Sequence, residues 1–365
     1  MKRYIDIIAG ARPNFVKIAP VIRALQREID KGWLCEFRLI HTGQHYDYAL
    51  SQSFFDQLQI PAPDMNLEVG SGTQGEQTAA ILIAYEAILM RGHVDLILVF
   101  GDVTSTLACA LAGAKLNIPI AHIEGGIRSR DRKMPEEINR IVTDALSKYF
   151  FTTTAEAGHN LISEGVKENQ IFWVGNTMID SLLQNRSRFF APLIFSEMSL
   201  DVNPYIVVTL HRPSNVDFAD SLISILRVIE RNASTVKFVF PTHPRTAKIL
   251  SEINFTSDSI HIIEPLSYLE FNFLVSHSVG VITDSGGITE ETTVLNIPCV
   301  TLRENTERPE TCTMGTNILV GNDMVKFADC VHRMVNRQWH KGEIPELWDG
   351  NSSDRIVNAL RMILP

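Results

Sequence analysis

The sequence has few cysteines and no long hydrophobic run. Its 365 residues include five cysteines, which are widely spaced and contain no C-x-x-C pair. A disulfide framework is therefore excluded as the basis of the fold, and we expect reduced thiols in a cytoplasmic protein. No apolar run reaches the roughly 20 residues that a membrane-spanning helix needs. Residues 1–9 are basic and then apolar, but this run is too short for a signal sequence, and it predicts a first strand instead.

Positive charge is also scarce. The chain has 33 Lys and Arg against 42 Asp and Glu, which gives a net charge of −9 at pH 7. An acidic protein repels nucleic acid and anionic membranes, so we expect neither as the main partner. A negatively charged ligand must then be bound by a local cluster of cations.

Motifs for common cofactors and metal ions are missing as well. We identify no Walker A loop and no G-x-G-x-x-G dinucleotide fingerprint, so neither ATP nor a nicotinamide cofactor is predicted. The cysteines and histidines do not combine into the spacing of a zinc site, and no aspartate cluster resembles a magnesium-binding motif. No serine or cysteine occupies a nucleophile elbow. We therefore expect no metal ion and no cofactor.

What the sequence does contain is a regular alternation of short apolar runs with segments of helical periodicity. This alternation predicts an α/β protein whose parallel sheets are covered by helices on both faces. Helices are predicted over 15–29, 77–90 and 104–114, among others. The predicted strands are 4–9, 36–42, 95–100, 119–124, 149–152 and 171–174 in the first half, and 205–210, 237–241, 260–263, 279–283, 299–302 and 318–320 in the second.

The length and the patterning predict two domains. A chain of 365 residues exceeds what one core usually organises, and the least patterned stretch, 184–204, is the predicted connection. The first domain is thus 1–184 and the second 185–350. A last helix is predicted over 354–363, with Ser353 or Asp354 as its N-cap. Two doubly wound domains bind ligands at the carboxyl ends of their strands, so functional residues are expected in the loops that follow the strands.

The most informative motif is Ser285-Gly286-Gly287, which lies between an apolar strand and a helical segment. Glycines let the backbone approach a ligand, and the free N–H groups at a helix N-terminus attract phosphate. Glu290 and Glu291 follow within the helix, where a carboxylate suits ribose hydroxyls. The alternative interpretation is a tight strand-to-helix turn with solvated acids.

Two further loops of the second half present a histidine with a nearby arginine after a predicted strand. His211 is followed by Arg212, and His243 is followed by Arg245. A buried core histidine is the common alternative for either one, but two such loops in one sheet favour a binding site. The loop that contains Arg308 follows another strand and adds a cation. We therefore predict a seat for a diphosphate in the second domain.

The first half also places ionisable residues after its strands. Arg12 and Lys17 follow the first strand, where two cations at a helix N-terminus suit a diphosphate; surface cations are the alternative. Asp102 follows the third predicted strand, and a helix N-cap is its alternative role. Glu124 ends an apolar strand, where an ionisable group is costly unless it is used or paired.

Arg128 is the partner that we predict for Glu124 if that residue is structural. Glu136 begins a helix, where an acid also suits the helix dipole. Asp102, Glu124 and Glu136 would stand opposite the predicted diphosphate seat, with His211 at the same cleft. Carboxylates beside a phosphorylated sugar suit the abstraction and return of a proton.

These motifs together resemble the UDP-N-acetylglucosamine 2-epimerase family, in the family's order and over nearly the whole chain. They are Gly10-Ala11-Arg12-Pro13 with Lys17, Thr42-Gly43-Gln44-His45, Gly101-Asp102, His122 to Ser129, Pro135 to Arg140, His211-Arg212, Thr242-His243-Pro244, Asp284 to Glu291, and Thr306 to Glu310. The resemblance implies two Rossmann-like domains of the glycosyltransferase-B type facing across a cleft. It also implies that residues 351–365 pack back on the first domain, and we expect a homodimer.

The resemblance assigns a role to each candidate residue. It implies that the second domain binds UDP, with Ser285, Gly286 and Gly287 at the diphosphate, Glu291 at the ribose, Arg308 nearby and Phe271 against uracil. It implies that Arg12 and Lys17 close over the phosphates, and Arg128 and His243 complete the predicted substrate-binding set. The catalytic positions of the family fall on Asp102, Glu124, Glu136 and His211.

The family's reaction needs no cofactor. The C2 proton of UDP-GlcNAc is removed and UDP departs from C1, which gives 2-acetamidoglucal as an intermediate. Return of a proton to the opposite face of C2 and of UDP to C1 gives UDP-ManNAc. In a hydrolysing branch, water takes C1 instead and releases free ManNAc and UDP.

Several functions remain open on the sequence. The first is a non-hydrolysing UDP-GlcNAc 2-epimerase. Relatives that epimerise a UDP-diacetamido uronic acid or a 6-deoxy amino sugar share the Gly10-Ala11-Arg12-Pro13 opening, so a modified UDP-HexNAc is the second, and the hydrolysing enzyme is the third. A glycosyltransferase or a nucleotide-sugar sensor is disfavoured, because neither needs three carboxylates beside the sugar. Tyr46 and the residue after it replace an Arg- and Gln-containing run of the allosteric bacterial enzymes, which argues against activation by UDP-GlcNAc.

Overall fold

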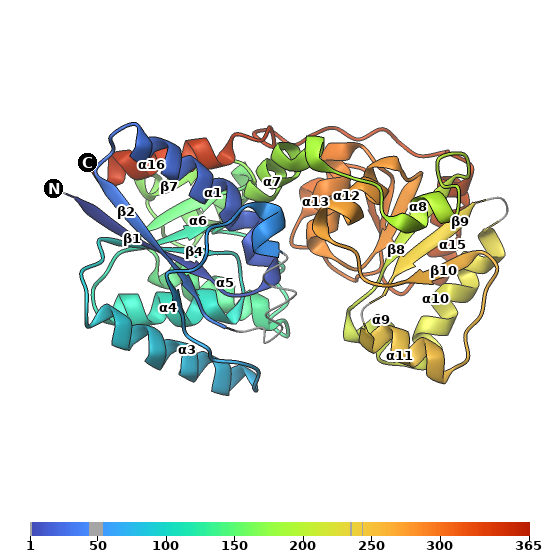
Figure 1. Ribbon diagram of the computed structural model, residues 1–365, viewed down its shortest axis with the longest axis horizontal. Coiled ribbons are helices and arrows are strands. Elements are labelled where there is room, and N and C mark those ends of the chain that lie inside the picture. The colour runs from blue at the N-terminus through green and yellow to red at the C-terminus, as the bar shows by residue number, and fades with distance from the viewer. Residues whose placement is uncertain (1, 44–53, 234–235, 243) are drawn as a thin grey trace. The chain divides into compact units, whose positions relative to one another are not determined.

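The computed structural model describes residues 2–43, 54–233, 236–242 and 244–365. Within them the chain divides into two compact α/β units, each with its own sheet (Figure 1). Unit 1 comprises Met1–Gln184 together with Glu346–Pro365, and unit 2 comprises Asn185–Pro345. The chain therefore returns to unit 1 at Glu346, ahead of the predicted point at 351.

Unit 1 is built on a parallel sheet. In the part of the chain that the structure describes, its seven strands run in the order β3-β2-β1-β4-β5-β6-β7. The strands are β1 (Arg3–Ala9), β2 (Cys35–His41), β3 (Met65–Asn66), β4 (Leu96–Phe100), β5 (Ile120–Ile123), β6 (Tyr149–Thr152) and β7 (Ile171–Trp173). All of these strands except β3 were predicted. β3 was missed because a strand of two residues shows no periodicity.

Helices cover both faces of this sheet. In Figure 1, α1 and α16 lie side by side on one face, and α3 and α4 lie together on the other. Alternate strand residues such as Ile97 and Val99 pack with Tyr85 of α3 in one apolar cluster. The helices are α1 (Arg12–Asp30), α3 (Gln74–Leu89), α4 (Thr104–Lys115), α5 (Pro135–Leu146), α6 (Ala155–Ser163), α7 (Thr177–Asn185) and α16 (Ser352–Ile363), with a short 3-10 turn at η1 (Glu168–Gln170).

The last helix is capped by another helix rather than by its own residues. The carboxylate of Asp180, on α7, accepts hydrogen bonds from the backbone N–H groups of Ser352 (3.0 Å) and Ser353 (2.6 Å). The predicted capping by Ser353 or Asp354 is wrong, because the helix begins at Ser352 and the preceding Asn351 makes no side-chain cap. A buried acid of unit 1 thus fixes the point at which the returning chain docks.

Unit 2 repeats the architecture. Its described strands form a six-stranded parallel sheet in the order β10-β9-β8-β11-β12-β13. They are β8 (Tyr205–Thr209), β9 (Lys237–Pro241), β10 (Ile260–Ile263), β11 (Gly280–Thr283), β12 (Cys299–Thr301) and β13 (Asn317–Leu319). The helices are α8 (Leu193–Glu197), α9 (Pro213–Val216), α10 (Ala219–Asn232), α11 (Pro244–Glu252), α12 (Tyr268–His277), α13 (Gly286–Leu295), α14 (Pro309–Thr313) and α15 (Met324–Val335), with a 3-10 turn at η2 (Arg186–Arg188).

The core of unit 2 lies on both faces of its sheet. Val208 belongs to an apolar cluster with residues of α10 and α15, whereas its neighbour Val207 belongs to a second cluster with residues of α12. The alternation follows from the period of two along a strand. The predicted α/β class with two helix-covered parallel sheets is thus confirmed.

The predicted connection 184–204 is for the most part packed structure. Phe195 of α8 makes an edge-on contact with the ring of Tyr205 at a centroid distance of 6.2 Å. Lys237 donates to the carbonyl of Met198 at 2.8 Å. The stretch lacked a visible pattern because α8 has only five residues.

Both sheets share one topological feature that positions ligands. In each sheet the first strand is an inner one, and the strands that follow it extend the sheet to one edge. The chain then returns to the other side of the first strand, so that β1 lies beside β4 and β8 beside β11. Helices flank the two sides of such a switch point, and a crevice opens there beyond the carboxyl ends of the strands. Several of the predicted site residues, among them Lys17, Asp102, Glu124, His211 and Ser285, follow β1, β4, β5, β8 and β11 in turn, so the topology places them at the carboxyl edge of the sheet within each unit.

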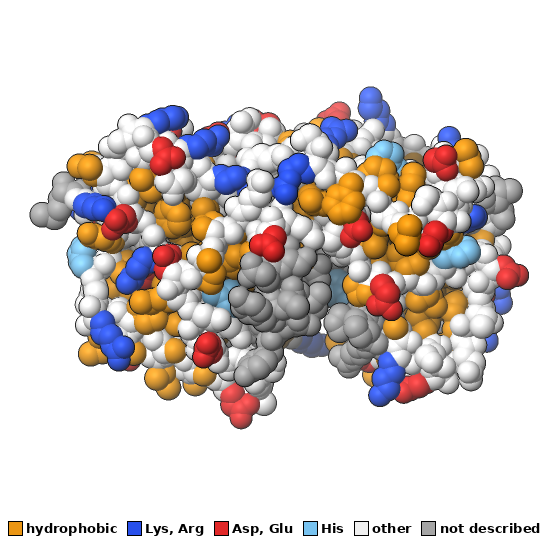
Figure 2. Space-filling view, in the orientation of Figure 1, with side chains coloured by type: hydrophobic (Ala, Val, Ile, Leu, Met, Phe, Trp, Pro, Cys, Tyr) orange, Lys and Arg blue, Asp and Glu red, His pale blue; other side chains and the backbone are white. Residues whose placement is uncertain are grey.

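The surface carries charges of both signs. On the face shown in Figure 2, Lys and Arg side chains are interspersed with Asp and Glu side chains and with scattered apolar ones. Among the described residues, no helix combines the length and the apolar character needed to cross a membrane.

Candidate functional site

Glu124 lies one residue beyond β5, in a strained backbone conformation. Its φ is +76°, a left-handed value that a non-glycine residue adopts at a cost of about 1 kcal/mol or more. Its N–H donates to the carbonyl of Phe151 at 2.8 Å, which holds it beside β6. Its Oε2 forms an ion pair with Nζ of Lys17, and the two side chains are only 7% and 10% exposed. The strain and the buried pair mark Glu124 as a functional candidate.

Arg128 is not the partner of Glu124, and that prediction is wrong. The Arg128 guanidinium lies 2.7 Å from Oδ2 of Asp144 and 2.5 Å from Oε2 of Glu164. The reason is the turn at Gly126, whose φ of +82° brings its backbone against Ala157 of α6. The chain is thereby carried toward the end of that helix, where Glu164 lies. Burial alone would lower the pKa of Arg128, but the carboxylates of Glu164 and Asp144 raise it above the ordinary value.

Asp102 follows β4 and is held by α5. Its Oδ2 accepts hydrogen bonds from Nη2 and Nε of Arg140 at 2.6 and 3.0 Å. The amide of Asn139 donates to the Asp102 carbonyl at 2.8 Å. Its predicted alternative role as a helix N-cap is wrong, because Val103 occupies that position in α4 without a side-chain cap. The carboxylate side chain is 23% exposed, so it is fixed by Arg140 and still accessible.

The two acids at the start of α5 have different environments. Glu136 is exposed, whereas Glu137 is 1% exposed. Glu137 accepts from the N–H groups of Ser129 (2.9 Å) and Arg130 (2.8 Å), and from Arg140 at 2.7 Å. Burial alone would raise the pKa of Glu137, but these three donors lower it below the ordinary value. Glu137 is therefore a structural acid that orders the loop and supports Arg140.

The sequence analysis missed this polar face of α5. Glu137, Arg140 and Asp144 are spaced by three and four residues, so they lie on one side of the helix. All three are buried. None of the three was assigned a role from the sequence. The sequence signal that could have identified this buried network is the presence of acidic and basic residues on one helix face, shortly after the Gly125-Gly126 turn.

In unit 2, the Ser285-Gly286-Gly287 motif begins α13 as predicted. Ser285 is the N-cap residue but makes no side-chain cap, and its N–H donates to Oγ1 of Thr283 at 3.0 Å. A methyl group added to Gly286 would lie 3.0 Å from Oε1 of Glu307, so glycine leaves room for this packing. The helix of ten residues ends at Asn296, which has a left-handed backbone. The first-turn N–H groups form the kind of terminus that binds anions.

His211 follows β8 and is anchored by Asp284, which follows β11. Nδ1 of His211 lies 2.8 Å from Oδ1 of Asp284, and the imidazole side chain is 55% exposed. The buried Asp284 also accepts from the N–H of Arg212 at 3.0 Å and from the side chain of Asn215 at 2.9 Å. Burial alone would raise the pKa of Asp284, but these donors lower it. The core-histidine alternative is wrong for His211, because an accessible imidazole lies at the carboxyl edge of the sheet.

The acids inside α13 are buried, so the alternative of solvated acids is wrong. Glu290 forms an ion pair with Arg308, and the two residues are 1% and 5% exposed. Glu291 accepts a hydrogen bond from the hydroxyl of Tyr268 at 3.0 Å. Burial raises the pKa of Glu291 to about 7, against the effect of this bond. The two adjacent acids thus have different partners: Glu290 pairs with Arg308, and Glu291 accepts from Tyr268.

The remaining predicted residues are placed only in part. Phe271 lies on α12, is partly buried, and packs against the apolar cluster that contains Val207. Arg12 begins α1, but its side chain lies outside the described residues, as do His243 and Tyr46.

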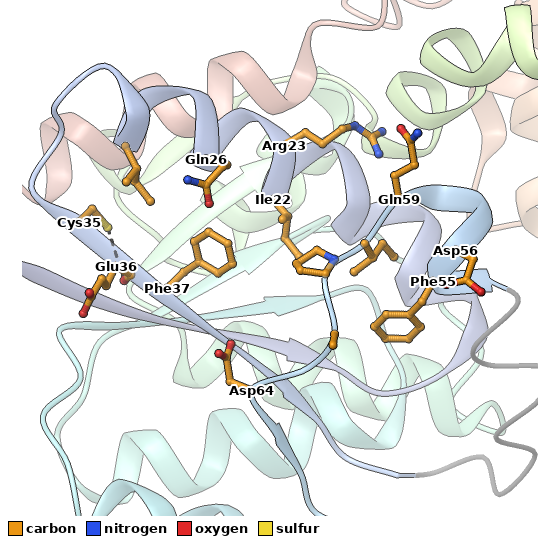
Figure 3. A pocket seen from close by; sticks show the side chains of 14 residues that line it. Ile22, Arg23, Gln26, Cys35, Glu36, Phe37, Phe55, Asp56, Gln59 and Asp64 are labelled. Carbon is orange, nitrogen blue, oxygen red and sulfur yellow. Dashed lines mark hydrogen bonds between the residues drawn. The ribbon is translucent and has the colours of Figure 1, made fainter.

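One pocket of about 860 Å³ lies on unit 1 between α1 and the first half of β2 (Figure 3). Phe37, Phe55 and Ile22 form its apolar wall, and Arg23 and Asp64 are among its polar residues. It contains none of the predicted site residues. The reason is that it opens beside the amino-terminal half of β2, whereas the candidate residues follow the carboxyl ends of the strands.

A G-x-G-x-x-G spacing, which was missed in the sequence, does occur at Gly70, Gly72 and Gly75, from the loop after β3 into the first turn of α3. It lies at the edge of the sheet, whereas a dinucleotide fingerprint follows the first, central strand. Within the described residues, no three His, Cys, Asp or Glu side chains converge to hold a metal ion.

The fold and the site now define the class of protein. Each unit has a Rossmann-like order of parallel strands. Together with the similar solved structures, this places the chain among the two-domain α/β proteins of the glycosyltransferase-B type. The UDP-N-acetylglucosamine 2-epimerase family matches residues 27–361, and this chain belongs to that family. The resemblance carried by the sequence motifs is therefore confirmed.

Individual relatives are similar in sequence over most or nearly all of the chain. It is 42% identical to a UDP-N-acetylglucosamine 2-epimerase of Methanocaldococcus jannaschii, over 98% of each chain. It is similar to the crystal structure of the M. jannaschii UDP-GlcNAc 2-epimerase in complex with UDP-GlcNAc and UDP, with a TM-score of 0.86, 41% identity, and coverage of 98% of this chain and 99% of that one. It is also 41% identical to a UDP-2,3-diacetamido-2,3-dideoxy-D-glucuronate 2-epimerase of Pseudomonas aeruginosa, over 87% of this chain and 89% of the relative.

Proposed function

We propose that this chain is a non-hydrolysing 2-epimerase that interconverts UDP-GlcNAc and UDP-ManNAc. The observation that carries the proposal is the placement of two carboxylates at the ends of adjacent strands. Asp102 follows β4 and is held by Arg140, and Glu124 follows β5 and is held by Lys17. Two acids fixed by cations at one sheet edge suit proton transfer to and from carbon. Family membership and the names of the relatives support the substrate.

The proposed reaction moves a proton and UDP in two stages. A carboxylate accepts the C2 proton, the electrons of the C2–H bond form the C1–C2 double bond, and UDP leaves C1 with the electrons of the C1–O bond. A second acid then returns a proton to the opposite face of C2 while UDP adds again at C1. Asp102, Glu124 and Glu136 are the proposed acids for these proton transfers. The ion pair with Lys17 holds the buried Glu124 in place, whereas Glu136 is exposed at the start of α5.

Unit 2 is proposed to bind the UDP moiety. The first-turn N–H groups of α13 at Ser285, Gly286 and Gly287 would receive the diphosphate, where the helix dipole favours negative charge. Glu291 is proposed for the ribose hydroxyls, and His211 for stabilising the departing diphosphate. The remaining proposed contacts are Arg308, Phe271 and His243 from the second half of the sequence, and Arg12, Lys17 and Arg128 from the first half.

A second candidate substrate has its own support. The Pseudomonas aeruginosa relative is named for a UDP-diacetamido uronic acid and is 41% identical over 87% of this chain. The chemistry at C2 is the same for both sugars, so the same acids would serve. The two candidates differ only in the groups at C3 and C6 of the sugar.

Incubation with UDP-GlcNAc in D2O, followed by NMR of C2, tests the proposal. We expect deuterium at C2 and the appearance of UDP-ManNAc. Free ManNAc and UDP would instead identify the hydrolysing reaction. Turnover of the UDP-diacetamido uronic acid without turnover of UDP-GlcNAc would favour the second candidate. Absence of exchange with either sugar would contradict the epimerase proposal altogether.

The proposal also includes a homodimer as the active form. Light scattering on the purified chain should give twice the monomer mass of 40.9 kDa. A mass equal to that of the monomer at working concentration would contradict this part alone.

A further inference from the structure

His122 is a fully buried histidine whose two ring nitrogens both face oxygen atoms. It lies on β5, two residues before Glu124, and is 0% exposed. Nε2 lies 2.8 Å from the carbonyl oxygen of Gly101, and Nδ1 lies 2.6 Å from Oδ1 of Asp144. A carbonyl oxygen only accepts hydrogen bonds, so Nε2 must carry a proton. The protonation of Nδ1 then depends on the state of Asp144.

Asp144 is surrounded by donors, which favours its ionised form. Its second oxygen, Oδ2, accepts from the N–H of Gly126 at 3.1 Å and from Nη1 of Arg128 at 2.7 Å. Burial alone would raise the pKa of Asp144, but His122 and Arg128 lower it below the ordinary value. An ionised carboxylate accepts hydrogen bonds only. Nδ1 of His122 must then donate as well, which leaves the ring doubly protonated and positively charged.

The carbonyl that His122 binds belongs to the turn that carries Asp102. Gly101 has a φ of +60°, and its N–H donates to the carbonyl of Ile123 at 3.0 Å. Both polar backbone groups of Gly101 are therefore tied to β5. A methyl group added to Gly101 would lie 3.0 Å from Nζ of Lys17 and 3.7 Å from Oε2 of Glu124. A shift of this turn would thus disturb Asp102 and the Lys17–Glu124 pair together.

We propose that His122 is a buried imidazolium that acts as a positioning residue: by donating to the Gly101 carbonyl and to Asp144, it fixes the turn that places Asp102 and Glu124 for proton transfer. The positioning role rests on the proposed function, whereas the charge state does not. The charged groups around the ring are Asp144 on α5 and, beyond it, Arg128 and Glu164.

The charge state is tested by NMR of the intact protein labelled with 15N-histidine, at about pH 8. The chain has 11 histidines, and a spectrum of His122→Asn assigns the signal that disappears. We expect both ring nitrogens of His122 in the protonated range. Free imidazole measured under the same conditions is the reference for a neutral ring, because pH 8 exceeds the ordinary histidine pKa of about 6.5. A deprotonated nitrogen on His122 would overturn the proposal.

The positioning role is tested by kinetics of His122→Asn and, as a matched variant, Asp144→Asn. Asn at position 122 cannot bridge Gly101 and Asp144, so kcat for epimerisation should fall at least about tenfold while the Kd of UDP stays within a few-fold. In Asp144→Asn, the ring of His122 should show one deprotonated nitrogen, and kcat should fall in parallel. Normal kcat in a folded His122→Asn protein would refute positioning. If the wild-type protein has the doubly protonated ring but no activity on any UDP-HexNAc, the proposed function fails and the charge assignment stands.

Discussion

Lys17 on α1 and Glu124 at the end of β5 form a buried ion pair. The sequence had placed Lys17 at a phosphate and Arg128 beside Glu124. The observed pair joins a residue after β1 to a residue after β5, which lies two strands away in the sheet. It fixes the ionised side chain of an acid that the proposed reaction uses. It also balances the positive charge of the Lys17 ammonium group.

The first prediction concerns Glu124→Gln. Loss of the carboxylate removes a proton carrier, so turnover should fall at least about a hundredfold, which is a typical acid–base contribution. The Kd of UDP should stay within a few-fold or decrease, because Lys17 loses its competing anion. Isothermal titration with UDP and the C2 exchange assay measure the two effects. Nearly normal turnover would show that Glu124 is only the structural partner of Lys17.

The second prediction uses the neighbouring acids Glu136 and Glu137 as a matched pair. Glu136→Gln should cut turnover at least about a hundredfold with no more than about 0.5 kcal/mol change in unfolding free energy, because this side chain is exposed. Glu137→Gln should destabilise the protein by about 2 kcal/mol or more, because its single amide oxygen cannot accept from Ser129, Arg130 and Arg140 together and its amide NH2 would face a buried donor. Urea unfolding and activity are compared. Equal effects of the two changes on stability would contradict the distinction.

The third prediction separates catalysis from binding at Asp102. Asp102→Asn should abolish turnover and leave the Kd of UDP within a few-fold, because the side chain contacts Arg140 in unit 1 while the proposed UDP seat is in unit 2. Arg140→Lys is the companion change. It keeps the charge but loses the two-nitrogen contact, so turnover should fall about tenfold or more. An Asp102→Asn protein that keeps most of its rate would remove Asp102 from the mechanism.

The fourth prediction is a pH dependence of stability through Glu291. Burial raises its pKa from 4.5 to about 7 in the folded state, so between these values the folded chain binds more protons than the unfolded chain. The stability that protonated Glu291 contributes is therefore fully present below about pH 4.5. As pH rises from 4.5 through 7, this stability is lost, and the free energy of unfolding decreases by on the order of 3 kcal/mol.

Glu291→Gln is the matched control for this effect. Gln stays neutral and still accepts from Tyr268, so the variant should become progressively more stable than the wild type as pH rises from about 4.5 to 7, with a constant difference above that. Thermal unfolding of both proteins across this range measures the difference. A difference that does not change with pH would show that Glu291 ionises in the folded state at its ordinary pKa.

The fifth prediction concerns the anion seat at the start of α13. UDP should raise the midpoint of thermal unfolding, because a ligand at a hundredfold excess over its Kd stabilises the folded state by about 2.7 kcal/mol. Gly286→Val should reduce this shift, since a Cβ at this position already approaches Glu307 to 3.0 Å. CDP serves as the control nucleotide and should act more weakly. The absence of any UDP effect at millimolar concentration would count against a nucleotide-sugar enzyme.

Much of the fold was predictable because it depends on local periodicity. The apolar runs that became β1, β4, β8 and β11 are bounded by polar loops and read directly as buried parallel strands. Strand ends were predictable to within a few residues, whereas β3, with two residues, gave no signal.

The sequence by itself also determined which loops are the candidates for the chemistry. Asp102, Glu124, His211 and Ser285 each follow a strand, and in parallel sheets the loops after strands meet at one edge. The family motifs pointed to the same residues. This information is local, because a residue's place relative to the end of its own strand does not depend on the rest of the chain.

Only the tertiary structure decided which of these residues are paired with one another. Strand order brings β1 beside β4 and places β5 next to it, so Lys17 meets Glu124 and His122 meets the Gly101 carbonyl across the sheet. Burial separated Glu136 from Glu137 although they are adjacent in the chain. Ion pairs and hydrogen bonds depend on distances between side chains from separate elements, and those distances exist only after the sheet has assembled.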